Sequence, residues 1–298
     1  MKILWLGNKR GALTDWSTQQ WVKATGQKIS LRDMPWLDGP VGESTKIGGD
    51  FFGQWAKANQ LVIRQSGTPR GLLQNLDDLA GASFDPTCVH SEVRRFYEQT
   101  SAYELEAWAE WTGRFRPFGS LVAALFSRRL EQLNVPLSAL DTSRGTTSEV
   151  LHLVDPETER VISAAWVRHL RGTGRVLYAG SYSVCRIPGY PSPCVRVVFP
   201  LPNGNGIVIL RPEVDEHGSL RVVSSGSRFG DPGFYFTVHR PEGHVWARYV
   251  RTMKEEIRVY AGEHPSVRAD HTMRLFGQVF LRLHYLLRPD GSVLAGAT

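Results

Sequence analysis

Long apolar runs are missing from this sequence. The chain has 298 residues, and no stretch of it reaches the roughly 18–20 apolar residues that a membrane-spanning helix needs. The first residues contain only a short apolar run with no small-residue cleavage site after it, which argues against a secretory signal peptide. These two absences predict a cytoplasmic protein.

Cysteine is also scarce. The three cysteines are Cys88, Cys185 and Cys194, and their spacing fits neither a zinc site nor the disulfide framework of a secreted domain. Cys185 and Cys194 flank a segment rich in proline, so they could face each other across the base of a hairpin. In a reducing cytoplasm, two buried free thiols are the simpler interpretation.

Motifs for nucleotides, metals and covalent catalysis are absent. The sequence has no HExxH, GxSxG or phosphate-loop pattern, so we expect no metal and no cofactor. The net charge is +6, but the basic residues occur singly or in pairs such as Arg94-Arg95. A nucleic-acid footprint would need a basic stripe, so we expect no nucleic-acid partner. Most of the basic residues are arginines, which is typical of a bacterial protein encoded by a GC-rich genome.

What is present is a long series of alternating apolar and polar residues. Alternation with a period of two is typical of half-buried β-strands. Eleven strand candidates are separated by short segments rich in glycine, proline and asparagine. They are residues 149–155, 160–170, 174–185, 194–200, 206–214, 219–226, 233–240, 244–251, 256–262, 266–275 and 278–288.

The preceding part of the chain has helical spacing. Asp50 can cap a helix over residues 51–60, and a second short helix is expected in residues 71–81. Apolar positions from Val89 to Trp111 fall near the helical period and predict a longer helix there. Residues 120–135 form a fourth helical candidate, which Pro136 ends.

These patterns predict an α+β fold. Residues 1–48 form a tryptophan-containing N-terminal extension, residues 49–136 a helical segment, and residues 137–298 an antiparallel meander of about eleven strands. We expect residues 49–298 to form one compact unit. So many consecutive strands curl rather than stay flat, so we expect a barrel-like sheet, resembling in architecture a lipocalin or a sheet that grips a helix.

Loop lengths in the last five strands predict specific strand registers. They pair Phe236 with Arg248, Arg248 with Val259, and Ile257 with His271. The resulting inner face is apolar except for Arg248, His271 and Tyr285. If the two faces were exchanged, Glu256 and Asp270 on the opposite face would be the acid/base candidates.

A buried arginine needs a partner, so this face suggests a pocket. We expect Arg248, with Trp246, Phe236 and Met273, to bind a hydrophobic or amphipathic small molecule. His271 could transfer a proton and Tyr285 could donate to a developing oxyanion. The structural alternative is that Arg248 pairs with a carboxylate and His271 is a hydrogen-bonded core residue.

The leading functional hypothesis is therefore small-molecule binding, with a metal-free cyclisation or isomerisation as the reaction that these groups would support. The alternative is a non-catalytic carrier or sensor with the same pocket. A further alternative is a protein–protein module, because most of the nine tryptophans lie before residue 112. The expected partner is a small molecule, with neither a nucleic acid nor a membrane involved.

Overall fold

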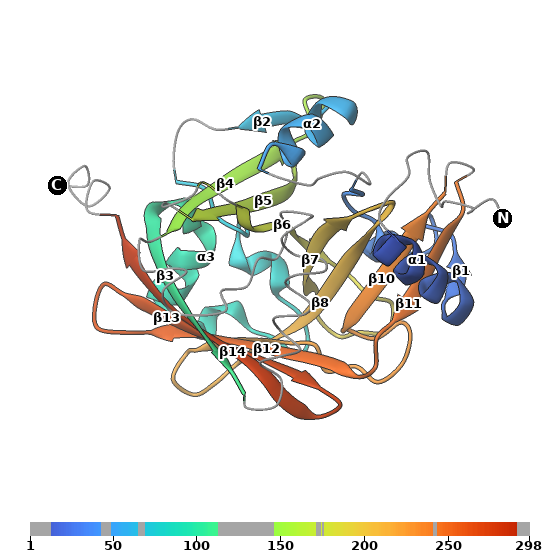
Figure 1. The fold of residues 1–298 in the computed structure, drawn as a ribbon. Coiled ribbons are helices and arrows are strands. Elements are labelled where there is room, and N and C mark those ends of the chain that lie inside the picture. The colour runs from blue at the N-terminus through green and yellow to red at the C-terminus, as the bar shows by residue number, and fades with distance from the viewer. Residues whose placement is uncertain are drawn as a thin grey trace.

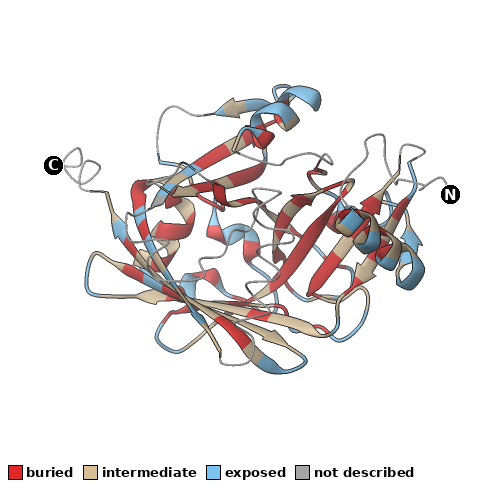
Figure 2. Ribbon diagram, in the orientation of Figure 1, coloured by how far each residue is buried: buried red, intermediate tan, exposed pale blue. Residues whose placement is uncertain are grey.

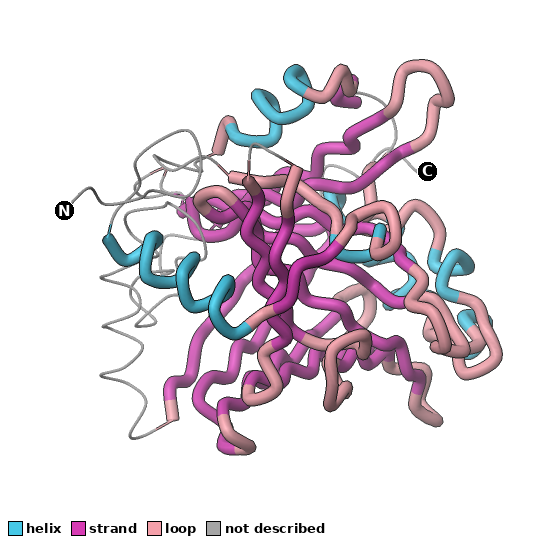
Figure 3. The backbone as a smooth tube through the Cα atoms, turned by 90° about the vertical axis from the view of Figure 1, so that its right-hand side faces the viewer, coloured by secondary structure: helices cyan, strands magenta, loops and turns pink. Residues whose placement is uncertain are grey.

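The computed structural model shows one large antiparallel sheet with short helices around it. The structure describes residues 13–42, 49–64, 69–112, 146–170, 174, 176–240 and 243–290. Across these residues it has three α-helices and fourteen strands. The helices are α1 (Leu13–Thr25), α2 (Phe51–Ala58) and α3 (Ser91–Glu98). The strands form the body of the molecule and the helices lie around it (Figure 3).

All eleven predicted strands are confirmed. They are β4 (Thr146–Val154), β5 (Val161–Leu170), β6 (Val176–Cys185), β7 (Cys194–Leu201), β8 (Gly204–Val214), β9 (Leu220–Val223), β10 (Phe234–His239), β11 (Val245–Tyr249), β12 (Met253–Ala261), β13 (Val267–Leu275) and β14 (Gln278–Pro289). Three further strands precede them, namely β1 (Gln27–Ile29), β2 (Val62–Arg64) and β3 (Tyr103–Trp111). The predicted sheet-rich antiparallel fold is therefore correct.

The sheet forks at β8. Its main path runs β2-β4-β5-β6-β7-β8-β9-β12-β13-β14-β3. One edge of β8 pairs with β7. Its other edge pairs first with β10, over Gly204–Val208, and then with β9, over Arg211–Val214. A short branch β10-β11-β1 leaves at this point (Figure 1).

The fork overturns one predicted hairpin. We expected β11 to pair with β12 through Arg248 and Val259, but β11 pairs with β10 and β1, and β12 pairs with β9 and β13. The other registers are confirmed: Phe236 pairs with Arg248, and Ile257 with His271. Residues 250–252 therefore carry the chain from the branch back to the main path.

The helical predictions hold only in part. Helix α2 is present, although the side chain of Asp50 makes no capping hydrogen bond. The short helix predicted within residues 71–81 is a 3₁₀ turn, Leu76–Leu79. The long helix predicted through Trp111 is wrong: α3 ends at Glu98, and the following residues form β3, paired with β14. The predicted helix 120–135 lies outside the described residues.

Residues of the N-terminal extension pack on the branch. Helix α1 contacts β10 and β11, and β1 pairs with β11. Trp36 is buried in a cluster with Leu37 and Tyr235, whereas Trp21 is 39% exposed beside Phe236. The tryptophans of this region thus differ in role, and Trp36 belongs to the core.

The core lies on both faces of the curved sheet (Figure 2). The largest cluster fills the concave side, between β4–β8 on one side and β12–β14 on the other, and includes Phe96 and Tyr97 of α3. A second cluster lies under α2 and includes Phe52, Ala165 and Val167. Strands β3 and β4 are neighbours at the two arms of the curve, but no hydrogen-bonded pairing joins them, so the sheet is not closed.

Candidate functional site

An interior cavity of about 210 Å³ lies on the concave side of the sheet. Most of its wall is apolar. The five strands β5, β6, β12, β13 and β14 contribute seven side chains with nitrogen or oxygen atoms to that wall: Trp166, Arg168, Tyr178, Tyr182, Glu255, His271 and Tyr285. Among the described residues, this is the place where titratable side chains gather inside the fold.

Alternation along β5 places an arginine in this cavity. Trp166 and Arg168 point to the concave side, whereas Ala165 and Val167 pack in the cluster under α2. Since successive strand residues point to opposite faces, Arg168 shares the concave face with the half-buried Trp166. Arg168 is only 4% exposed.

A glycine on β6 makes room for two tyrosines. Gly180 lies directly opposite Trp166, between Tyr178 and Tyr182 on the same face. A Cβ atom at Gly180 would lie 2.6 Å from the hydroxyl oxygen of Tyr178. The missing side chain lets the hydroxyl groups of Tyr178 and Tyr182 meet at 2.6 Å, where one donates to the other.

Arg168 is held in place by aromatic rings and lacks a carboxylate. Its guanidinium carbon lies 5.5 Å from the ring centre of Trp166 and 5.6 Å from that of Tyr285. No ion pair joins it to a described acidic residue, and its Nε and Nη2 atoms are buried without a hydrogen-bond partner among the residues that the structure describes. Burial lowers the pKa of Arg168, and the neighbouring tyrosines oppose that shift. An arginine remains charged in proteins, so this is a buried cation with incomplete compensation.

The three cavity tyrosines are hydrogen-bond donors at neutral pH. Burial raises the pKa of Tyr178 and of Tyr182. Burial also raises the pKa of Tyr285, although the nearby Arg168 and its hydrogen bond act in the opposite direction. All three hydroxyl groups therefore keep their protons and present O–H donors to the cavity.

A carboxylate–imidazole pair lies on β12 and β13, across the cavity from β5 and β6. His271 Nε2 is 3.1 Å from Glu255 Oε2, and Glu255 is 8% exposed. Glu255 is on β12, directly opposite Met273 of β13. His271 is two residues from Met273 on β13, so Glu255 and His271 are diagonal neighbours on the cavity face. The backbone N–H of Glu255 donates to the hydroxyl of Ser224, which fixes that end of β12. Such a pair can take up and release a proton.

The structure brings together only part of the predicted site. His271, Tyr285 and Met273 line the cavity. Phe236, Trp246 and Arg248 lie on the branch of the sheet and are not among the cavity-lining residues. Arg248 donates to the backbone oxygen of Thr25, and its guanidinium carbon lies 5.8 Å from the ring centre of Trp21. The misassigned β11–β12 pairing explains this separation.

Sequence reasoning missed Arg168, Tyr178, Tyr182 and Glu255. The local signal was present, because Trp166-Val167-Arg168 and Tyr178 to Tyr182 around Gly180 each place polar atoms on an apolar face. What was lacking was the knowledge that β5 and β12 face each other across the fold. Alternation gives the face of a strand but not its partners across a curved sheet.

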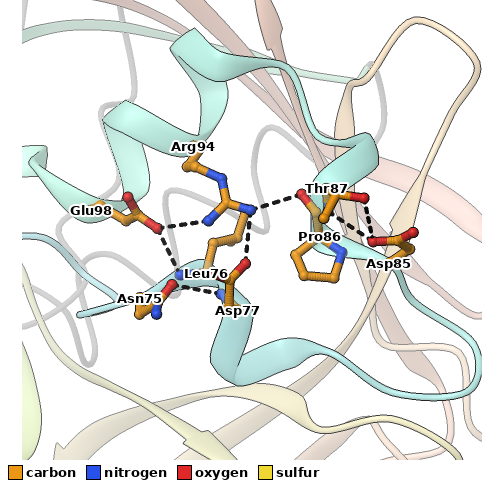
Figure 4. Close-up of polar contacts among 8 residues, drawn as sticks. All are labelled: Asn75, Leu76, Asp77, Asp85, Pro86, Thr87, Arg94 and Glu98. Atoms are coloured by element: carbon orange, nitrogen blue, oxygen red, sulfur yellow. Dashed lines mark hydrogen bonds and ion pairs between the residues drawn. The ribbon is translucent and has the colours of Figure 1, made fainter.

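Helix α3 and the loop before it form one wall of the cavity, and a polar network fixes them (Figure 4). Arg94 donates to Asp77 at 2.9 Å, to Glu98 at 3.2 Å and to the backbone oxygen of Pro86 at 3.0 Å. Glu98 also accepts from the backbone N–H of Leu76 at 2.9 Å. This network ties the 3₁₀ turn to α3, so that Leu72 and Tyr97 meet the cavity from fixed positions.

No group of three or more His, Cys, Asp or Glu side chains that could hold a metal ion occurs within the described ranges. No helix within those ranges is both long and apolar enough to cross a membrane. Cys185 and Cys194 face each other as a cross-strand pair, as their spacing suggested, and both are free.

Comparisons with known proteins give one informative match. The chain is 28% identical over 243 residues to "Uncharacterized membrane protein YndJ" of Bacillus subtilis (strain 168). The match covers 80% of this chain and 41% of that protein, so the chain spans less than half the length of its relative. No family model matches the sequence. No solved structure matches it either.

This relative corrects one expectation. The prediction of a cytoplasmic protein is contradicted, because the similar protein is named a membrane protein. The prediction rested on the lack of long apolar runs in these 298 residues alone.

Proposed function

We propose that this protein binds an amphipathic small molecule in the interior cavity, with an oxygen of that molecule held by Arg168. The observation that carries the proposal is the burial of Arg168 in the cavity wall without an ion pair to a described carboxylate and with two of its nitrogen atoms unpartnered among the described residues. Leaving a buried charge unpaired costs several kcal/mol, roughly 3–5 where one partner of a pair is removed. A ligand carboxylate, enolate or carbonyl oxygen would supply the missing acceptors.

The apolar lining indicates the rest of the ligand. Leu105, Val197, Leu210, Val222 and Ile257 surround the polar groups. In this proposal the sheet from β4 to β3 acts as a barrel-like wall around a hydrophobic body. The name of the Bacillus subtilis relative refers to a membrane, where amphipathic molecules are abundant, and this supports fatty-acid-like probes as a first choice.

The same groups would support a metal-free acid/base reaction, such as a cyclisation or an isomerisation. His271, oriented by Glu255, would remove a proton from a carbon next to the bound carbonyl and return it at another position. Arg168 and the hydroxyl group of Tyr285 would stabilise the oxyanion formed in between. The alternative, a carrier or sensor, uses Arg168 for binding and needs no proton transfer.

Binding is tested by titrating the protein with cis-parinaric acid, a fluorescent fatty acid with one carboxylate. We expect Arg168→Gln to weaken binding about 10- to 100-fold, since a hydrogen bond to a charged group contributes about 1.5–3 kcal/mol. Arg248→Gln is the matched control, because it removes a strand arginine outside the cavity, and should change the affinity less than twofold.

Two outcomes would overturn the binding proposal. One is a wild-type protein that binds no fatty acid and carries no small molecule in native mass spectrometry. The other is equal weakening by Arg168→Gln and Arg248→Gln, which would indicate a general loss of structure.

Isotope exchange distinguishes an enzyme from a non-catalytic carrier. The molecule that co-purifies with the protein is incubated with it in D₂O, and its mass is followed. An enzyme that moves a carbon-bound proton raises the ligand mass, and His271→Gln should stop this gain while leaving the affinity within about threefold. A carrier gives no gain with either protein.

A further inference from the structure

Strands β5 and β6 separate before their ends. Their last cross-strand pair is Ala164 with Tyr182. Beyond it, Val161 and Ser163 continue to pair with β4, and Ser183–Cys185 continue to pair with β7. A groove of about 470 Å³ opens between the two diverging strands.

This groove adjoins the interior cavity. Leu72 and Tyr182 line both spaces. Tyr182 is also the residue whose hydroxyl group meets that of Tyr178 inside the cavity, at 2.6 Å. Leu72 and Tyr182 therefore belong to the wall between the cavity and the groove.

The size of the cavity makes the groove relevant. At about 210 Å³ the cavity lies below the range of roughly 300–1,000 Å³ that is typical of small-molecule sites. A ligand of ordinary size that reaches Arg168 would therefore extend beyond the cavity. The groove is the neighbouring space with a shared wall.

We infer that the groove is an outer subsite, which takes the distal part of an elongated acyl-type ligand whose oxygen-bearing end is held at Arg168. This inference rests on the proposed function. Leu73, Ile162 and Val184 give the groove an apolar wall for methylene groups. The hydroxyl of Ser163 is buried there without a described partner, and the charged residues that line the groove are Arg160, Arg186 and Asp78. These groups favour a polar or anionic distal end over a bare methyl end.

The wall that carries Leu73 and Gln74 is held by α3. The network of Arg94, Asp77 and Glu98 fixes the turn that follows it (Figure 4). The opposite wall belongs to two paired strands. The groove is therefore preformed, as a chain-length-selective subsite requires.

The test is a series of straight-chain carboxylates, from octanoate to hexadecanoate, titrated calorimetrically. Burial of a methylene group contributes about 0.8 kcal/mol, which is about fourfold in Kd, and partial burial in an open groove gives less. We expect the wild-type Kd to fall about two- to fourfold per added methylene throughout the series. In Gln74→Trp/Ile162→Trp, which fills the groove from both walls, the Kd should stop falling once the cavity is full.

The decisive comparison is between the two ends of the series. The filled variant should bind octanoate within twofold of wild type and hexadecanoate at least tenfold more weakly. Val62→Trp, at an exposed valine of β2 that lines neither space, is the control and should change neither. If the double variant does not fold, Gln74→Trp alone changes an exposed loop residue and should show the same trend.

The outcomes distinguish the two proposals. Equal weakening of octanoate and hexadecanoate, or no weakening of either, overturns the outer subsite while leaving the cavity as the binding site. A wild-type protein that binds no member of the series overturns the proposed function and this inference with it. Tighter binding of hexadecanedioate than of hexadecanoate, reduced by Arg160→Gln/Arg186→Gln, would support the polar distal end.

Discussion

Beyond β8 the sheet divides into two regions that use the same kinds of residues differently. The main path, β9-β12-β13-β14-β3, curves back over the concave side and forms one wall of the cavity. The branch, β10-β11-β1, is covered by α1. Both regions are antiparallel, and in both the side chains alternate between the two faces. The main path encloses the cavity, whereas helix α1 packs against the branch.

The arginines Arg168 and Arg248 show what this difference means. Each lies near an aromatic ring and each has a buried Nε without a described partner. Arg248 donates to the backbone oxygen of Thr25, so α1 supplies its acceptor. Arg168 faces a cavity: its side chain contacts Tyr285, but no backbone oxygen of the described residues accepts a hydrogen bond from its Nε or Nη2. An inward arginine is thus a sign of a binding site only where no element of the chain covers it.

The largest expected effect compares two strand glycines, Gly180 of β6 in the cavity wall and Gly206 of β8, where the branch strand β10 pairs. Gly180→Ala places a Cβ atom 2.6 Å from the hydroxyl of Tyr178, whereas Gly206→Ala meets nothing closer than Leu201 Cδ1 at 3.6 Å. Overpacking a filled core costs about 1–3 kcal/mol, so Gly180→Ala should lower the free energy of unfolding in urea by that amount. Gly206→Ala should leave it unchanged or slightly raised. Equal losses would show that β6 in the cavity wall is no more tightly constrained than β8 at its pairing with β10.

The next prediction concerns the loss of stability at low pH that Asp215 causes. Asp215 lies where β8 turns to β9, and its carboxylate accepts from Arg258 at 2.8 Å. Burial alone would raise its pKa, but hydrogen bonds from Ser219, Arg258 and His217 outweigh burial and lower it to about 2. A carboxyl group with a lowered folded-state pKa stabilises the fold above its ordinary pKa near 3.8, and this stabilisation is lost as the pH falls towards 2.

Because this carboxyl group is partly exposed and screened by solvent, Asp215→Asn should lower the free energy of unfolding by about 1 kcal/mol at pH 7 and by much less near pH 2. Hydrogen exchange locates the effect. Amides of β9 and β12 should exchange faster in the variant, while those of β10 and β11 should not change. A uniform increase in both regions would mean that the two regions unfold as one unit.

The smallest expected effect on the free energy of unfolding comes from replacing the two arginines, and it compares the two regions most directly. Arg168→Met removes a buried charge and should raise the free energy of unfolding of the ligand-free protein by about 1 kcal/mol, as replacement of buried charges by apolar residues often does. Arg248→Met loses its bond to Thr25 and should lower it by about 1 kcal/mol. Thermal unfolding of the two variants checks this opposition. If Arg168→Met is the less stable of the two, Arg168 has a structural role.

Alternation in the sequence was sufficient to find the strands but not their neighbours. The eleven strands of the C-terminal part were predicted because each is bounded by turn residues and has its own apolar face. The β11–β12 pairing failed because consecutive strands pair in only about two-thirds of cases. Nothing local in residues 250–252 distinguishes a hairpin turn from a crossing between two parts of the sheet.

The prediction of a helix over the residues of β3 was wrong for a different reason. In YELEAWAEW, residues 103, 105, 107, 109 and 111 are apolar or aromatic and alternate with three glutamates and Trp108, but glutamate, leucine and alanine also favour helices. Pairing with β14 decided the outcome, and that partner lies far away in the sequence. The candidate site was half predicted for the same reason: His271 and Tyr285 are on neighbouring strands, while Arg168 comes from the opposite arm of the curve.

The pairing of β3 with β14 also sets an order of events during synthesis. Thr112, just after β3, bonds to Val279, and 167 residues separate the two. At roughly 5–20 residues per second, β3 leaves the ribosome about 10–30 seconds before its partner exists. Until then the cavity-lining residues Leu105 and Ala107 have no neighbouring strand to pair with. The cavity is therefore among the last parts of the protein to form, and a chain that stops short of β14 would have the arginine without the enclosure.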